Sequence, residues 1–239
     1  MGSQVRFANS LTEGTGRHLV FLAIAAMVLF TSFYPPTGAG ILIAFALIIA
    51  INIVRKAGLA GLGLSLPVNF RKTLMWGVVW GAAFQCVDVL FLTPVIENLT
   101  GVDTDYSQFV GIEGNIVQLV AWLVMVWLVV VLVEEVVFRR YFFEEISSRI
   151  GEKGDWPIIS IALATVFFGV AHWYQGVSGV ISTGVIGAFM LVLYLKAGRN
   201  LWLPMIAHGT INTIGLTFFY FGLYHIDDLI WGLSHITER

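Results

Sequence analysis

Two adjacent carboxylates, Glu134 and Glu135, follow a long apolar run and could take part in acid–base chemistry. A charged side chain on a lipid-embedded helix is costly, so both must face protein or water, which makes them candidates for a functional site. Neighbouring residues on a helix point about 100° apart, whereas Glu135 and Arg139 share a face at i,i+4 spacing. We therefore expect Glu135 to pair with Arg139 and leave Glu134 free for chemistry. The alternative is that both acids only mark the cytoplasmic end of the helix.

Two histidines lie in later apolar segments, each with a partner one helical turn away. His172 follows Phe168 by four residues and Asn212 follows His208 by four, so each pair shares one helix face. An imidazole can exchange a proton near neutral pH, and an amide can donate a hydrogen bond to a developing oxyanion. Taken alone, His172 is more often a buried structural residue, and the pair of His208 and Asn212 could equally be an interhelical hydrogen-bond device.

The composition predicts that these residues lie within a helical membrane protein. Of the 239 residues, 58% are hydrophobic and 12% are charged, whereas a soluble domain has roughly 25% charged residues. We expect an all-α, polytopic bundle of about seven (six to eight) transmembrane helices with the active site inside the bundle, since a spanning helix needs about 20 apolar residues. The seven apolar segments are 19–34, 39–54, 73–95, 116–138, 156–172, 177–195 and 201–222.

The distribution of charge predicts the orientation of the chain. With the N-terminus in the cytoplasm, twelve of the thirteen basic residues fall in cytoplasmic segments, as the positive-inside bias requires. The connection 96–115 has four acids and no base, which is typical of an outward-facing loop. We expect a multi-pass integral membrane protein with a cytoplasmic N-terminus, and with Asp227 and Asp228 outside. The formal net charge of −2 argues against a nucleic-acid partner.

A cytoplasmic hairpin would bring the candidate residues to one depth in the membrane. If the chain from Glu134 stays helical to a turn at 151–154 and returns antiparallel, each arm has about 17–18 residues, so Glu134 and His172 lie at the same level. His208 reaches that level if the segment 139–156 projects about 14 Å into the cytoplasm. The three side chains are therefore expected to meet.

Three motifs resemble those of the CPBP family, which includes the CAAX proteases and bacteriocin-processing enzymes. Residues 134–139 are similar to its EExxxR motif, residues 168–172 to FxxxH and residues 208–212 to HxxxN. Each motif is weak alone, but the three occur in the family's order on separate apolar segments.

The resemblance also implies how the chain is organised. It extends over about 122–221. Residues 116–222 are expected to form the catalytic helical core of one integrated membrane domain. Residues 1–115 would add N-terminal transmembrane helices that show no family pattern, and residues 223–239 would form a C-terminal tail.

The function implied by the resemblance is hydrolysis of peptide bonds, by an intramembrane endopeptidase, in membrane-associated or lipid-proximal peptides. Glu134 and His172 would activate water, His208 and Asn212 would stabilise the oxyanion, Glu135 would organise Arg139, and Phe168 would pack beside His172. The family is also described as metalloproteases, so Glu134, His172 and His208 are conditional ligands of a zinc ion. No HExxH motif is present, and we slightly favour water activated by glutamate and histidine without a metal.

Two other classes of function remain open on the sequence. Embedded Glu and His residues also build proton relays, so a proton-coupled transporter is one alternative, although no inverted repeat is found. A non-catalytic immunity or scaffold protein with the same fold is the other. Asp88, in the apolar segment 73–95, is either a second functional acid or a buried, hydrogen-bonded residue. The identity of the substrate is left open.

Overall fold

A computed structural model describes residues 14–33, 38–151 and 157–223, and within these ranges every regular element is a helix. This confirms the all-α prediction. The α-helices are α2 (Gly14–Phe33), α3 (Ala39–Val54), α4 (Gly58–Gly61), α5 (Phe70–Val87), α6 (Thr93–Thr100), α7 (Ile116–Met125), α8 (Val131–Glu134), α9 (Glu144–Ile150), α10 (Ile158–Val170), α11 (Gly176–Lys196) and α12 (Trp202–Tyr220). The N-terminal residues 1–13 and the predicted tail from residue 224 onward, including Asp227 and Asp228, lie outside the described residues.

Wider, π-helical turns join several of these helices without a break. Asp88–Leu92 connects α5 to α6, while Val126–Val130 and Glu135–Phe143 connect α7, α8 and α9. Short 3-10 turns cover Ser107–Ile112 and Trp173–Gln175. π-Helical turns are rare in proteins, and those that occur are often found at functional sites. Two of these three turns begin at an acid within an apolar helix, Asp88 and Glu135.

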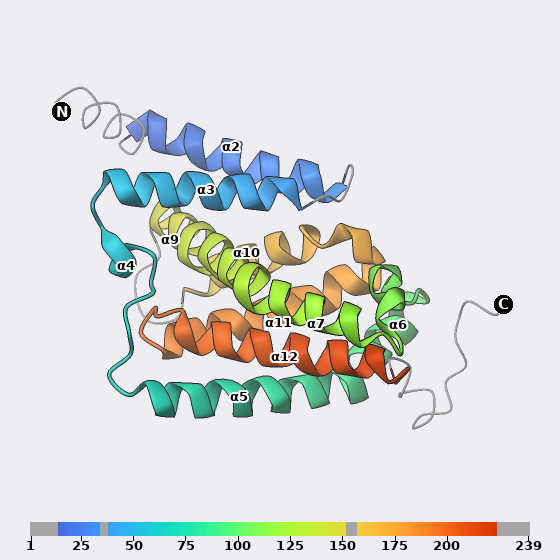
Figure 1. Ribbon diagram of the computed structural model, residues 1–239. Coiled ribbons are helices and arrows are strands. Elements are labelled where there is room, and N and C mark those ends of the chain that lie inside the picture. The colour runs from blue at the N-terminus through green and yellow to red at the C-terminus, as the bar shows by residue number, and fades with distance from the viewer. Residues whose placement is uncertain (1–13, 34–37, 152–156, 224–239) are drawn as a thin grey trace.

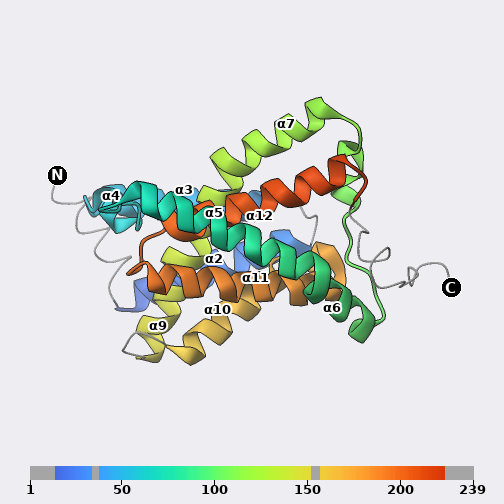
Figure 2. The ribbon, with the colours of Figure 1, turned by 90° about the horizontal axis from the view of Figure 1, so that it is seen from below.

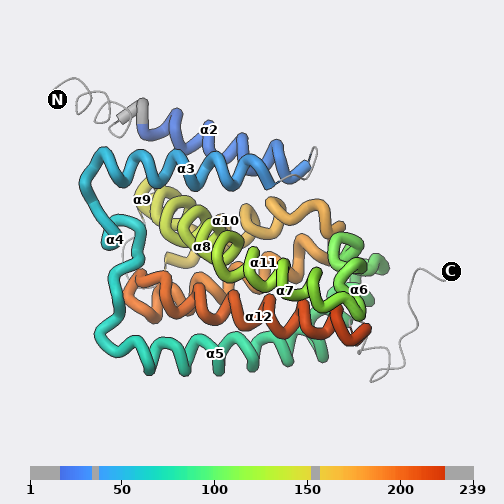
Figure 3. The backbone as a smooth tube through the Cα atoms, viewed as in Figure 1, coloured from blue at the N-terminus to red at the C-terminus, as the bar shows by residue number. Residues whose placement is uncertain are grey.

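The helices form a bundle in which residues 131–143 of the continuous helix α7–α9 are largely buried, while α7 lies at one edge (Figure 2). In Figure 1, α2 and α3 lie together along one side of the bundle, and α5 and α12 lie side by side along the opposite side. Figure 3 shows α8 between α7 and α9 along one continuous helix. Seen from below in Figure 2, α5 again runs beside α12, and α10 runs beside α11. The predicted catalytic helices are therefore covered by helices from the N-terminal part of the chain.

Three helical stretches are long and apolar enough to cross a membrane: Phe70–Thr100, Ile116–Ile150 and Trp173–Lys196. Three shorter apolar helices, Arg17–Phe33, Ala39–Val54 and Ile158–Val170, accompany them. Many large hydrophobic side chains on these helices are exposed, such as those of Val117 and Leu128 at 74% and 69%, as is favourable on a surface that meets lipid. The structure fits an integral membrane protein, while the count of about seven spans and the cytoplasmic N-terminus stay predictions.

The helix that contains Glu134 is longer than the predicted segment 116–138, because it continues to Ile150. Gly151 ends it with a φ of 76°, a left-handed conformation that favours glycine. The chain then returns as α10, which packs against α9 and the π-helical turn Glu135–Phe143. This is the antiparallel arrangement that the hairpin prediction requires, although residues 152–156 of its turn lie outside the described residues.

The main hydrophobic core lies where the N-terminal helices meet the hairpin. Buried aliphatic side chains of α2 and α3, such as Ile24 and Ala44, pack in one cluster with Phe138, Phe142 and Phe143 of the π-helical turn. Phe168 of α10 and Tyr194 of α11 complete the cluster. Packing of this kind fixes the rotation of the long helix, and so fixes which of its acids point into the protein.

The contact between α10 and α11 depends on small residues. A Cβ atom at Gly169 would lie 2.4 Å from the carbonyl oxygen of Val180, whereas the nearest atom to a Cβ at Gly184 would be 3.7 Å away. We expect Gly169→Ala to push α10 off α11 and destabilise the protein by about 1–3 kcal/mol. Gly184→Ala, on the facing helix, is the matched control and should be tolerated. Thermal unfolding of both variants in detergent tests this packing, and equal midpoints would contradict it.

Candidate active site

The bundle contains a partly open cavity of about 300 Å³, and several of the predicted site residues line it. Glu134, His172, His208 and Asn212 line it together with Phe168. These side chains come from the long helix, from the end of α10 and from α12. The structure thus brings together five residues that the three motifs place up to 78 positions apart in the sequence.

Glu134 is the last residue of α8 and lines the cavity, whereas Glu135, the next residue, is fully buried. Its side chain is 15% exposed, and its Oε2 atom is 4.0 Å from Nε2 of His208. Glu134 and His172 also line a second cavity of about 120 Å³ beside α2 and α3. The two residues therefore stand between two cavities, accessible from both.

Glu135 and Arg139 lie behind the cavity wall, and they are 0% and 1% exposed. Arg139 Nε is 3.3 Å from Glu135 Oε2, so the pairing expected from their i,i+4 spacing is present. Glu135 Oε1 is also 2.8 Å from Nδ1 of His208. One carboxylate thus holds an arginine of its own helix and a histidine of α12, and the second contact has no counterpart in the sequence prediction.

Phe168 connects the buried ion pair to His172. The Arg139 guanidinium lies over the Phe168 ring, 4.2 Å from its centroid, and the His172 ring is 4.7 Å from it on the same helical face. The ring fits because residue 187 on α11 is a glycine: a Cβ there would lie 2.6 Å from Phe168 Cδ1. Phe168 therefore packs beside His172, and it also covers a buried cation.

The hydrogen bonds of the two histidines determine which ring nitrogen is available in the cavity. His172 Nδ1 is 2.8 Å from the carbonyl oxygen of Phe168. A carbonyl can only accept, so this nitrogen carries the proton and Nε2 remains free. His208 Nδ1 donates in the same way to the Glu135 carboxylate, which leaves its Nε2 facing Glu134. Both rings therefore offer Nε2 for chemistry.

The position of α12 is fixed by the small residue next to His208. The Trp127 ring occupies the space beside Gly209, where a Cβ would lie 2.4 Å from the ring. Trp127 Nε1 also donates to the hydroxyl of Thr213, at 3.0 Å. These contacts orient the face of α12 that presents His208 and Asn212 to the cavity.

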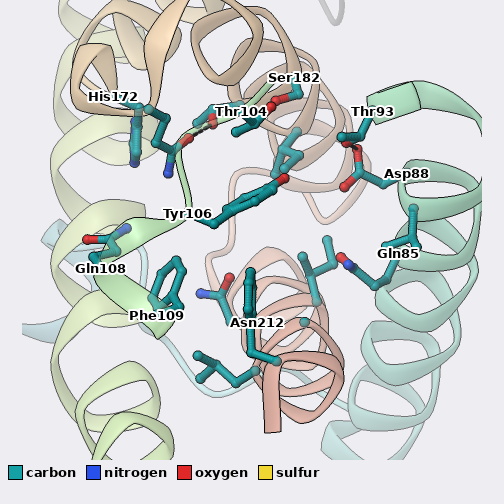
Figure 4. A pocket seen from close by; sticks show the side chains of 18 of the residues that line it. Gln85, Asp88, Thr93, Thr104, Tyr106, Gln108, Phe109, His172, Ser182 and Asn212 are labelled. Atoms are coloured by element: carbon teal, nitrogen blue, oxygen red, sulfur yellow. Dashed lines mark hydrogen bonds between the residues drawn. The ribbon is translucent and has the colours of Figure 1, made fainter. Parts of the chain in front are cut away.

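The segment 101–115 was predicted only as part of a loop on the outer side of the membrane, and sequence reasoning did not identify it as part of the site. In the structure this segment folds against the bundle, and Thr104, Tyr106, Gln108 and Phe109 line the cavity (Figure 4). Backbone contacts fix it in place, because Asp105 N donates to the carbonyl of Gln175 at 2.9 Å, and Glu97 Oε1 accepts from Thr104 N at 2.8 Å. The aromatic residues within this acidic stretch were the available signal, since side chains of that kind are usually buried.

The N-terminal part of the chain also contributes more than generic helices. Gln85, Asp88, Thr93 and Glu97, from the helix Phe70–Thr100, line the same cavity. Asp88 is buried and accepts a hydrogen bond from Thr93 at 3.3 Å. The cavity is therefore built by residues on both sides of the predicted division at 115/116, which agrees with one integrated domain but leaves the division itself a prediction.

Comparison with known proteins gives one match. Residues 116–214 match the family model described as "Rce1-like", with the full description "Type II CAAX prenyl endopeptidase Rce1-like". No curated protein and no solved structure matches the chain. The matched residues contain the three motifs and the side chains that meet at the cavity, which confirms the resemblance to a CPBP-type protease. Residues 116–214 are therefore similar to the Rce1-like family of type II CAAX prenyl endopeptidases, which is consistent with a CPBP family intramembrane protease.

Proposed function

We propose that the protein is an intramembrane endopeptidase that hydrolyses a peptide bond of a membrane-associated peptide within the 300 Å³ cavity. The observation that carries this proposal is the convergence of Glu134, His172, His208 and Asn212 on one cavity. Neither a transporter nor a non-catalytic scaffold protein gains support from the family match. A non-catalytic scaffold protein leaves this convergence without a role, and a proton relay does not require the amide of Asn212.

In the proposed reaction, Glu134 and His172 activate a water molecule. The Glu134 carboxylate or the free Nε2 of His172 can take a proton from the water, while the water oxygen attacks the peptide carbonyl carbon. The proton then passes to the leaving amine nitrogen as the C–N bond breaks. Oxygen from water ends in the new carboxylate, and the other fragment leaves as an amine.

His208 and Asn212 stabilise the negative charge that forms on the carbonyl oxygen. Asn212 can donate from its amide. Because His208 Nδ1 already donates to Glu135, His208 donates from Nε2 only when the ring carries both protons. Glu135 at Nδ1 and Glu134 near Nε2 provide the negative charge that balances this form. Glu135 and Arg139 are therefore positioning residues, which act through His208 and Phe168.

Zinc, the conditional cofactor, requires protein ligands that converge on one point at about 2.0–2.2 Å. Within the described residues, no three His, Cys, Asp or Glu side chains come together as a metal site. Glu134, His172 and His208 line one cavity, yet they are not arranged as three ligands of one ion. We therefore derive no step through a metal and propose that the residues alone activate the water.

The metal-free proposal predicts that exhaustive chelation leaves the cleavage rate unchanged. The protein, purified in detergent, should cleave at the same rate before and after dialysis against a chelator, because no ion is needed to lower the pKa of the attacking water. Elemental analysis of the active protein should then show far less than one zinc per chain. About one zinc per chain, lost together with activity and restored with it, would overturn the metal-free mechanism.

The peptidase activity itself is tested in lipid nanodiscs with a panel of peptides. The panel should include short peptides that end in a prenylated CAAX sequence, signal-peptide remnants and apolar peptides with blocked ends. We expect mass spectrometry to detect two fragments whose masses sum to the substrate plus one water. If the protein cleaves no member of the panel while the same discs with a known membrane peptidase do, the proposed function is wrong for these substrates.

A further inference from the structure

The segment 55–72 crosses one end of the helix bundle. It leads from the end of α3 to the first turn of α5, and Figure 1 shows it running past α4 along that end. Both helices that it joins are apolar, and the stretch that begins with α5, Phe70–Thr100, is long enough to cross a membrane. In an integral membrane protein, a connection between two such helices lies at the level of the lipid headgroups.

This segment is fixed to the bundle by hydrogen bonds to its carbonyl groups. Arg140 Nε donates to the carbonyl of Gly61 at 2.8 Å, and Asn200 Nδ2 donates to that of Ser65 at 2.7 Å. Between these two contacts, the side chain of Leu62 is buried in the main hydrophobic core. The side of the segment that faces away from the bundle therefore has a defined position.

Large apolar side chains project from that outer side. Leu59 and Leu66 are 63% and 74% exposed, and Val68 is fully exposed. On the flank of a membrane helix such side chains would meet lipid chains, but these three lie in the connection between two helices. Contact with water at that place is unfavourable. Insertion into the boundary between headgroups and acyl chains removes this cost.

Four basic residues flank the apolar side chains. Arg55 and Lys56 precede them, Arg71 and Lys72 follow them, and all four are exposed. None of the four forms a salt bridge with another residue of the described chain. The outer side of the segment thus combines positive charge with apolar side chains.

Acids of this protein do not balance that charge in the described structure. The acids that α9 brings to the same end, Glu144 and Glu145, already pair with arginines outside the segment. The connection 96–115, which has four acids and no base, lies with α6 at the opposite end of the bundle (Figure 1). The segment 55–72 is therefore complementary to a partner that is both anionic and apolar.

We propose that the outer side of segment 55–72 binds anionic phospholipids of the leaflet at this end of the bundle. The four basic side chains pair with lipid phosphates, while Leu59, Leu66 and Val68 insert beside the acyl chains. A zwitterionic lipid also has a phosphate, but its ammonium group repels the same side chains, so the surface prefers a lipid with net negative charge. The proposal does not depend on the proposed peptidase activity.

The lipid preference of the purified full-length protein tests this proposal. The protein in detergent is equilibrated with equal amounts of phosphatidylglycerol and phosphatidylcholine that have the same acyl chains, and native mass spectrometry counts the lipids that stay bound. We expect about 5-fold more phosphatidylglycerol than phosphatidylcholine, and a smaller ratio at high salt. Inorganic phosphate at millimolar concentration should not displace the lipid, because it has no acyl chains.

Variants of the basic residues locate the binding surface. Replacing Arg55, Lys56, Arg71 and Lys72 together with glutamine should lower the ratio to less than about 2-fold. The matched control exchanges arginine and lysine at the same four positions, which keeps every charge, and it should retain the preference.

A pair of leucine variants tests the apolar part of the surface. Leu66→Ser should lower the amount of bound phosphatidylglycerol by about 2-fold or more, because the inserted side chain is lost. Leu99→Ser is the matched control, since Leu99 is 80% exposed but belongs to α6 at the opposite end of the bundle. It should leave the amount unchanged.

Several results would overturn the proposal. Equal retention of the two lipids, or displacement of phosphatidylglycerol by inorganic phosphate, would show that no anionic lipid is recognised. A preference that survives the four glutamine substitutions would place the lipid on another surface. The comparison of the two lipids on the parent protein decides the matter even if the glutamine variant fails to fold.

Discussion

Replacing Glu134 with glutamine is expected to lower kcat/KM for peptide cleavage by ~10²–10⁴-fold, because the amide cannot take a proton from water. Stability should be little affected. The Glu134 carboxylate makes no close ion pair, its nearest described basic atom being His208 Nε2 at 4.0 Å. The thermal midpoint in detergent should therefore stay within about 2 °C of the parent protein.

The control for this experiment is Glu145→Gln on the same continuous helix. Glu145 pairs with Arg149 and Arg17 and does not line the cavity, so it should keep nearly full activity. His172→Ala should lose as much activity as Glu134→Gln, since His172 is the second group that can hold the proton. Nearly full activity in either active-site variant, measured on purified protein, would remove that residue from the proposed mechanism.

Replacing Glu135 with alanine is expected to cause the largest loss of stability, about 3–5 kcal/mol, because Arg139 would be left as an unpaired charge in a fully buried place. This corresponds to a thermal midpoint lower by roughly 10 °C. Activity should fall as well, since His208 would lose the acceptor at Nδ1 that orients its ring.

A pair with the same spacing on the same helix provides the control. Glu145 and Arg149 are also an i,i+4 ion pair, but their side chains are 13% and 18% exposed rather than 0% and 1%. Glu145→Ala should therefore cost about 1 kcal/mol or less. A midpoint for Glu135→Ala equal to that of Glu145→Ala would show that the buried pair has no special importance for stability.

Activity of Glu135→Gln distinguishes positioning from simple stability. Glutamine retains an oxygen that can accept from His208 Nδ1, but it removes the charge that balances a doubly protonated ring. We expect this variant to fold better than Glu135→Ala and still to lose kcat. Activity that tracks stability alone in both variants would argue for a purely structural role.

The set of residues at the cavity was predicted from the three family motifs, and helix geometry predicted two features of their arrangement. The i,i+4 spacing predicts the pairing of Glu135 with Arg139, and the hairpin length predicts that Glu134 and His172 reach one level. Both arrangements depend on a single helix or on two consecutive ones. Local periodicity is sufficient information for contacts of this kind.

The contacts that sequence reasoning missed are between elements far apart in the chain. The bond of His208 to Glu135 depends on the rotation of α12, which is set by Trp127 beside Gly209. The inward turn of 101–115 depends on Glu97 and on the carbonyl of Gln175. Acidic composition predicts exposure on average, but it contains no information about a carbonyl some seventy residues further along the chain.

The helix boundaries differ from the predicted segments for a similar reason. Apolar character ends near residue 138, yet the helix continues to Ile150 because Arg139 finds buried partners and Phe142 and Phe143 pack into the core. Hydropathy measures the preference for lipid and does not detect a helix stabilised by tertiary packing beyond the apolar stretch.

Single-turnover cleavage in heavy-oxygen water tests most directly whether Glu134 and His172 activate a water that attacks the peptide bond. Protein in excess over a cleavable peptide is mixed in labelled water, quenched, and both products and the protein are analysed by mass spectrometry. The proposed mechanism predicts one labelled oxygen in the new carboxylate of the product and none in the protein segment that contains Glu134. A labelled oxygen in Glu134, which would require an acyl-enzyme anhydride, or unchanged cleavage by the Glu134→Gln protein, would contradict it.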